Sequence, residues 1–156
     1  MNGGVISGNE AHTASAIAGN GGCGGGIYIA SAYNEIKAGT IENNKADDQG
    51  GGCYVASVPY SLCFYNSIIA SNTASILGGG VWVCPTGDVK AYIYDGAACY
   101  GNTAKYAADA IAIVRNKNRA TTILSDRMLG GGPANWYQDG EIDGSDLGFP
   151  ILPPTR

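Results

Sequence analysis

Three aromatic residues that recur at nearly constant spacing are the best candidates for binding chemistry in this sequence. Each follows a glycine pair and stands between two apolar residues, and they are Tyr28, Tyr54 and Trp82. If the flanking residues point into a core, the aromatic side chains point outward, because side chains alternate along a β-strand. An exposed aromatic column can stack on sugar rings or anchor a protein partner. Packing between strands, worth about 0.2–1 kcal/mol per pair, is the simpler interpretation and needs no ligand. Cover of the column by the loop at residues 58–60, or by a neighbouring chain, is a third possibility.

Acid–base chemistry is less well supported by the sequence. A polysaccharide lyase needs acidic residues for calcium and a basic residue, and a glycoside hydrolase needs two carboxylates at a defined separation. The acidic pair Asp47-Asp48 is explained by a solvated turn, and the single histidine, His12, by a solvated loop. We therefore expect no catalytic residues, and a carbohydrate-cleaving enzyme is the alternative.

The sequence also indicates neither a metal nor a cofactor. An odd number of cysteines cannot all pair within one chain, and the absence of C-x-x-C spacing does not suggest zinc. We interpret several of them as small buried apolar residues. The glycine run at residues 21–26 lacks the Lys-Ser/Thr of a phosphate loop. The acidic residues 139–146 do not match a calcium loop, so we expect a linker there.

Charge and hydropathy exclude two classes of partner. The 156 residues include 9 Lys and Arg against 13 Asp and Glu, a net charge of −4, whereas nucleic-acid binding needs clustered basic residues. No run of 18 apolar residues is present, so we expect no direct membrane insertion. Residues 1–22 have no basic segment followed by an apolar one, and any export signal would therefore lie outside this sequence.

Two repeated signals position the aromatic residues. One is the glycine pair before each apolar strand, and the other is the pattern apolar-x-x-Asn-x-Ala around Asn9, Asn44, Asn72 and Asn102. Eight residues separate the last three asparagines from the second glycine, or from Ala110 in the fourth copy. The first copy has 17 residues there, which indicates an insertion around residues 12–21. The period between successive glycine pairs is 26, 28 and 30 residues.

Short alternating apolar segments at this period predict a parallel β-helix. Helical repeats tolerate interior glycine poorly, at about 1 kcal/mol each, and alternation is the periodicity of strands. We predict an all-β, right-handed parallel β-helix (solenoid) of about four coils over residues 1–117. Residues 118–156 are expected to form a last partial coil, an irregular C-terminal cap and an acidic, Pro-rich tail, with Trp136 plugging the core.

Residues one period apart should then form columns along the rod. The expected inward columns are Ile27/Cys53/Val81/Ile111, Ile29/Val55/Val83/Ile113, Ile6/Ile41/Ile69/Cys99 and Ile36/Phe64/Tyr94. The four asparagines should mark a corner, because Asn tolerates left-handed backbone and bonds its own turn. Stacked Asn side chains can also bond to one another along the rod. Ligand binding by these asparagines is a weaker alternative.

Residues 3–115 resemble the repeats of known protein families through two combined motifs, Gly-Gly-[Ile/Cys/Val] and [Ile/Cys]-x-x-Asn. They resemble the GGA[ILV] and FxxN repeats of polymorphic outer membrane proteins of the autotransporter type, with Ile or Cys in place of Phe. They are also similar to repeats of large surface proteins from gut bacteria. The resemblance implies a right-handed parallel β-helix used as a surface or adhesin passenger, as in pectate-lyase-like solenoids.

From the residues and the resemblance together we expect a non-catalytic, extracellular or cell-surface scaffold. Its partners would be surface glycans or host or bacterial proteins. The alternatives are a polysaccharide lyase or glycoside hydrolase fragment with a β-helix fold, and a module that self-associates end to end or through its edges.

Overall fold

The computed structural model describes residues 1–13, 21–56, 61–83, 88–91, 97–106, 111–115, 121–124 and 138–143. Regular structure in these residues is all β, and the strands are β1 (Asn2–Ser7), β2 (Glu10–Ala11), β3 (Ile27–Ile29), β4 (Asn34–Glu42), β5 (Lys45–Ala46), β6 (Cys53–Val55), β7 (Ser61–Ala70), β8 (Thr73–Ala74), β9 (Val81–Val83), β10 (Asp88–Ala91), β11 (Ala98–Tyr100), β12 (Thr103–Ala104), β13 (Ile111–Arg115), β14 (Thr121–Leu124) and β15 (Gln138–Asp143). Within these ranges no helix is long and apolar enough to cross a membrane.

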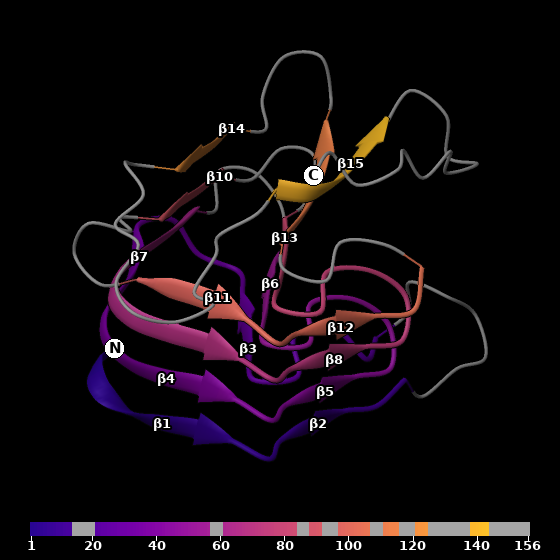
Figure 1. Cartoon of the computed structure of the whole chain (residues 1–156), viewed down its shortest axis with the longest axis horizontal. Coiled ribbons are helices and arrows are strands. Elements are labelled where there is room, and N and C mark those ends of the chain that lie inside the picture. Colours follow the sequence, from indigo (N-terminus) through magenta and orange to yellow (C-terminus); the bar gives the residue numbers. More distant parts are fainter. Residues whose placement is uncertain are drawn as a thin grey trace.

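The strands form three sheets, and the named strands within each pair in parallel. Sheet 1 has the order β1-β4-β7-β10-β14, with β11 also on β7; sheet 2 has the order β12-β8-β5-β2; sheet 3 has the order β15-β13-β9-β6-β3. The chain passes through sheets 1, 2 and 3 in turn before it returns to sheet 1 (Figure 1). Neighbouring strands therefore come from successive repeats, and the expected all-β, parallel character is confirmed.

The register between repeats is the one that the sequence predicts. The Cα atom of Val55 pairs with those of Ile29 and Val83, and Ile41 pairs with Ile6 and Ile69. The inward residues of these columns form one apolar core, whose largest fully buried side chains are Phe64, Ile41, Leu62, Ile69, Leu77, Val55, Val81 and Val83. Tyr94 of the predicted fourth column lies outside the described residues.

The four asparagines form a continuous hydrogen-bonded ladder at the corner between sheets 1 and 2. Asn72 Nδ2 donates to Ile41 O at 3.0 Å and to Asn102 Oδ1 at 2.9 Å. Asn72 Oδ1 accepts from both N and Nδ2 of Asn44 at 3.0 Å. Asn9 makes the same two contacts with Asn44 Oδ1. Asn44, Asn72 and Asn102 are buried and Asn9 is exposed, so the ladder joins all four repeats through side-chain amides.

The left-handed residue at this corner precedes each ladder asparagine, which corrects the expectation that the asparagine itself takes this conformation. Positive φ angles of +68°, +53°, +56° and +62° fall on Gly8, Asn43, Ser71 and Gly101. These residues turn the chain, and the asparagine that follows is left to bond along the ladder.

Glycine is required at the paired positions because the backbone of the next repeat lies very close to them. A Cβ atom at Gly51 would lie 2.5 Å from the backbone oxygen of Thr73, and one at Gly25 would lie 2.5 Å from that of Lys45. Since real Cβ contacts are not this short, a side chain at either position would force the repeats apart. Positive φ belongs to the glycine before each pair, for example Gly50 at +68°.

The sheets continue past residue 117. Strand β14 pairs in parallel with β10, and β15 pairs in parallel with β13. The interpretation of the acidic segment as a linker is therefore wrong for Gln138–Asp143, because backbone pairing decides its structure despite its charge. Trp136 and most of the insertion around residues 12–21 lie outside the described residues.

The ladder predicts that replacing its asparagines lowers the free energy of unfolding by unequal amounts. Asn72→Ala removes the acceptor of the buried Asn44 N–H, one of the two bonds of the Asn44 side-chain amide, and the donor to the Ile41 carbonyl, so we expect the free energy of unfolding to fall by at least about 2 kcal/mol. Asn9→Ala, at the exposed end, should cost about 1 kcal/mol or less. Urea denaturation of both variants measures the difference, and equal losses would contradict the ladder.

Candidate functional site

The three predicted aromatic residues form one stacked column on sheet 3. Strands β3, β6 and β9 place Tyr28 opposite Tyr54 and Tyr54 opposite Trp82. The ring centroids of Tyr28 and Tyr54 are 5.0 Å apart with an interplanar angle of 18°, and those of Tyr54 and Trp82 are 4.5 Å apart at 5°. Because adjacent strands are about 4.8 Å apart, the in-register backbone alone brings the rings into face-to-face contact.

Exposure falls steeply along the column. The Tyr28 residue is 56% exposed, Tyr54 is half-buried and Trp82 is only 6% exposed. Trp82 was expected to be an exposed contact residue, and that expectation is wrong. Tyr54 stacks on one face of its ring, and the corner backbone lies close to the base of the side chain, since a Cβ atom at Gly78 would be 2.9 Å from the Trp82 Cβ.

The stacking limits what the column can bind. Ligands stack on ring faces, but Tyr54 and Trp82 turn faces toward each other and Tyr54 also covers one face of Tyr28. Tyr28 stands on β3, the last strand of sheet 3 within the described ranges. The free face of the column is therefore the outer face of Tyr28, with hydroxyl groups along the edge as hydrogen-bonding positions.

A cysteine lies beside this column, and its environment opposes nucleophilic chemistry. Burial raises the pKa of the Cys23 thiol, and Asp48 adds to the rise, while hydrogen bonds with the Gln49 backbone and the Tyr54 side chain oppose it. Burial also raises the pKa of Cys53. Since the thiolate is the reactive form, both residues serve better as packing groups than as nucleophiles.

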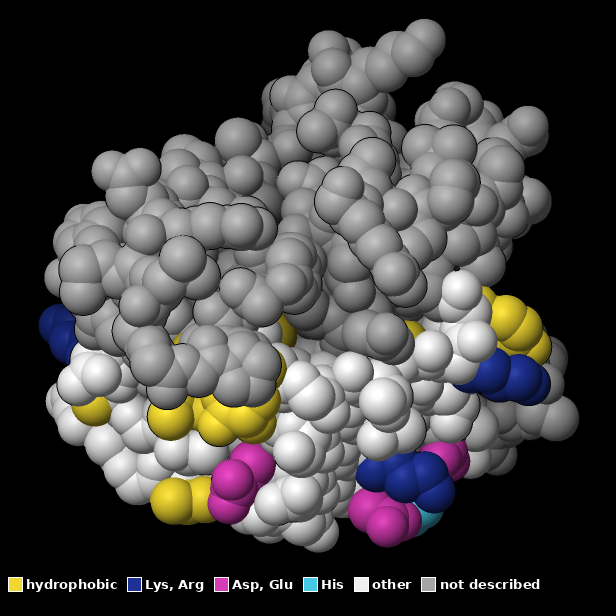
Figure 2. Space-filling model, viewed as in Figure 1, with side chains coloured by type: hydrophobic (Ala, Val, Ile, Leu, Met, Phe, Trp, Pro, Cys, Tyr) yellow, Lys and Arg dark blue, Asp and Glu magenta, His cyan; other side chains and the backbone are white. Residues whose placement is uncertain are grey.

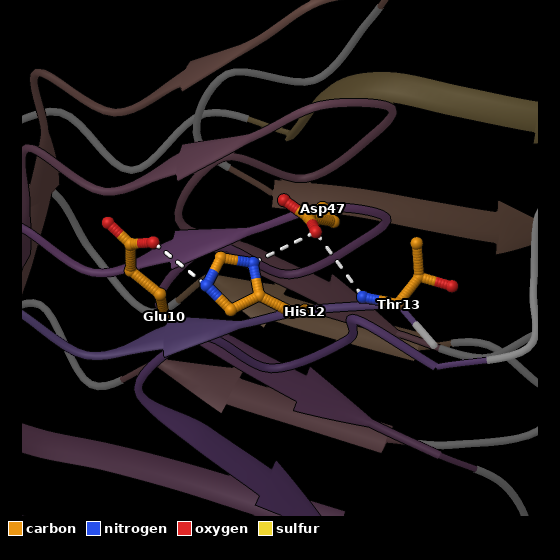
Figure 3. A network of polar contacts seen from close by, with 4 residues as sticks. All are labelled: Glu10, His12, Thr13 and Asp47. Atoms are coloured by element: carbon orange, nitrogen blue, oxygen red, sulfur yellow. Dashed lines mark hydrogen bonds and ion pairs between the residues drawn. The ribbon is translucent and has the colours of Figure 1, made fainter. Parts of the chain in front are cut away.

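A second polar cluster surrounds the single histidine. His12 Nδ1 lies 3.1 Å from Asp47 Oδ2, and His12 Nε2 lies 3.0 Å from Glu10 Oε2 (Figure 3). The Thr13 backbone N–H donates to the same Asp47 oxygen at 3.3 Å. Acidic and basic side chains gather around the histidine on this face (Figure 2). His12 is solvated, as expected, with its side chain 64% exposed, but it also contacts two carboxylates, which we did not predict from the sequence.

This cluster is a charged clamp between the first two repeats. Both ring nitrogens can donate to carboxylates only when the imidazole is protonated. The sequence carried a signal for the contact that we did not use: His12 and Asp47 each stand three residues after a ladder asparagine. Asp48, also expected in a solvated turn, is buried at 3% exposure.

Other polar groups do not converge on a metal. Within the residues that the structure describes, no group of three or more His, Cys, Asp or Glu side chains could hold a metal ion. Thr73 and Thr103 are joined by a hydrogen bond of 3.1 Å between their hydroxyl oxygens, and they stack beside the ladder on sheet 2.

The clamp predicts a pH dependence of stability. The hydrogen bond from His12, and then that from the Thr13 N–H, lower the pKa of Asp47. In acid the unfolded chain therefore binds more protons at this group. Its stabilisation is complete above the ordinary Asp pKa of about 3.9 and is lost as the pH falls through the lowered folded value.

We expect the melting temperature of the wild type to fall more between about pH 5 and pH 2 than that of Asp47→Asn or His12→Ala. Differential scanning fluorimetry across this range measures the profiles. If the wild-type and variant profiles superimpose, protonation of Asp47 does not affect the stability of the fold, and the prediction is wrong.

Comparison with known proteins finds no relative of this chain. No family model, no curated protein and no solved structure matches the chain. The resemblance to polymorphic outer membrane proteins therefore rests on the spacing of the Gly-Gly and Asn signals in this sequence.

Proposed function

We propose that this chain is a right-handed parallel β-helix that serves as a non-catalytic scaffold and presents a binding surface for glycans or proteins. The proposal of a β-helix is supported by three parallel sheets that the chain visits in the same order in successive repeats. Right-handedness follows from the general preference of parallel crossover connections. The Asn ladder supports the same arrangement, because it repeats one corner in four successive turns of the chain.

The observation that carries the binding role is the open face of Tyr28. The Tyr28 ring stacks on that of Tyr54, with 5.0 Å between their centroids, and the residue remains 56% exposed. An aromatic ring fixed by its neighbour loses little conformational freedom when a sugar or an apolar side chain stacks on it. The resemblance to autotransporter repeats supports an extracellular or cell-surface location.

The engaged histidine favours a scaffold over a lyase or hydrolase. A general acid–base histidine needs a nitrogen directed at its substrate, whereas both nitrogens of His12 face carboxylates of the same chain. Assays for reducing sugars or unsaturated products on acidic polysaccharides test the enzyme alternative directly.

Tyr28→Ser should weaken binding of any captured glycan or protein by about fivefold, because one stacking contact of this kind is worth on the order of 1 kcal/mol. Tyr106→Ser is the matched control, since Tyr106 is 55% exposed and lies outside the column. A glycan array followed by titration of the best ligand measures both variants.

The proposal fails if the wild type binds no glycan and no surface protein, or if the two variants lose affinity equally. Melting temperatures show whether Tyr28→Ser remains folded, and we expect only a small decrease.

A further inference from the structure

Within the described residues, the first repeat forms one end of all three sheets. Strands β1, β2 and β3 are each the last strand of their sheet within the described ranges, and Figure 1 shows β1 and β2 along one side of the molecule. The edge of β1 is regular from Val5 onward, because its register with β4 shifts between Asn2 and Val5. Open parallel edges are templates for a further strand.

The inner repeats show which groups on such an edge bind the preceding repeat. The residue after each ladder asparagine donates its N–H to the asparagine carbonyl of the repeat before, as Lys45 does to Asn9 and Thr73 does to Asn44, both at 2.9 Å. Glu10 holds this position in the first repeat. Its N–H therefore points away from β5, at the edge of β2, as a donor of the same kind.

The asparagine side chain offers the matching acceptor. Asn44 Oδ1 accepts from the N and Nδ2 atoms of Asn9, and Asn72 Oδ1 accepts from those of Asn44. Asn9 Oδ1 occupies the equivalent place at the open end and would accept from an asparagine of an added repeat. The donor at Glu10 and this acceptor lie on adjacent residues, so they define both the position and the register of an incoming chain.

The apolar core also reaches this end. Met1, Ile6 and Ile27 pack against the core but remain only partly buried. A hollow of about 370 Å³ lies beside them, with Ile27, Ile29, Ile36 and Leu62 in its wall and Lys37 among its polar lining residues. Ile27 and Ile29 belong to the first repeat, Ile36 to the second and Leu62 to the third, so the hollow opens the core beside β4 where β1 does not extend.

We propose that this open end binds an extended polypeptide segment with the pattern apolar-x-x-Asn-x-Ala, which adds in parallel as one more repeat. The Glu10 N–H and Asn9 Oδ1 bind its asparagine, and its apolar residue packs on Ile6, which is only partly buried in the chain alone. A repeat added to β3 would also cover the outer face of Tyr28, but the contacts that carry this inference are those of Glu10 and Asn9 and require no ligand at Tyr28.

The sharpest probe is a repeat of the chain itself. A fluorescein-labelled peptide of residues 34–56 with Cys53→Ser contains the pattern around Asn44. Fluorescence anisotropy should show saturable binding to the wild type. The same peptide with Asn44→Ala should bind at least about tenfold more weakly, because it lacks the amide that bonds Asn9.

Two substitutions of Glu10 distinguish the contribution of its backbone N–H at the strand edge from that of its side-chain carboxylate. Glu10→Pro removes the outward N–H, whereas Glu10→Ala keeps it and removes only the carboxylate that faces His12. Peptide binding should be retained in Glu10→Ala and weakened at least about tenfold in Glu10→Pro. If Glu10→Pro does not fold, Asn9→Ala serves as the second variant and should also weaken binding.

The proposal is overturned if the wild type does not bind the peptide up to about 1 mM, or if Glu10→Pro binds it as tightly as Glu10→Ala. Sedimentation velocity tests a second copy as the natural occupant. Self-association that Glu10→Pro removes supports the open end as the contact, whereas self-association unchanged in Glu10→Pro, together with no peptide binding, overturns it.

Discussion

The buried asparagine ladder is the constraint on which the other features of this molecule depend. Each inner amide bonds both to the asparagine of the next repeat and to a backbone carbonyl of the repeat before, as Asn72 does with Asn102 and Ile41. A slip of one residue would bury these amides without partners, and each such group costs about 1–3 kcal/mol. The ladder therefore fixes the register in a chain whose ladder asparagines are 35, 28 and 30 residues apart.

That register accounts for the candidate surfaces. It places Tyr28, Tyr54 and Trp82 in one stacked column, and it brings His12 against Asp47 of the next repeat. It also gives the first repeat an edge donor at Glu10 and an acceptor at Asn9 of the kind that join the inner repeats. Stability and binding capacity thus come from the same repeated contacts, and the glycine pairs keep the strands close enough for both.

Much of the architecture could be predicted because the Gly-Gly and Asn signals keep phase, which sets the columns around Val55 and Ile41. Alternation shows which side chains leave the core, but it does not show whether another group covers them, so the burial of Trp82 was missed. The clamp at His12 was missed because the insertion begins there and hides the phase. The strand at Gln138–Asp143 was missed because its acidic composition resembles a linker.

The most direct test of the account is the contact between methyl groups one period apart. A methyl-labelled NOESY spectrum of the whole chain should show cross-peaks from Val55 to both Ile29 and Val83, and from Ile41 to both Ile6 and Ile69. These pairs are adjacent only when the repeats stack in the register described. A spectrum in which Val55 contacts neither partner, or contacts residues displaced along the strand, would contradict the stacked arrangement.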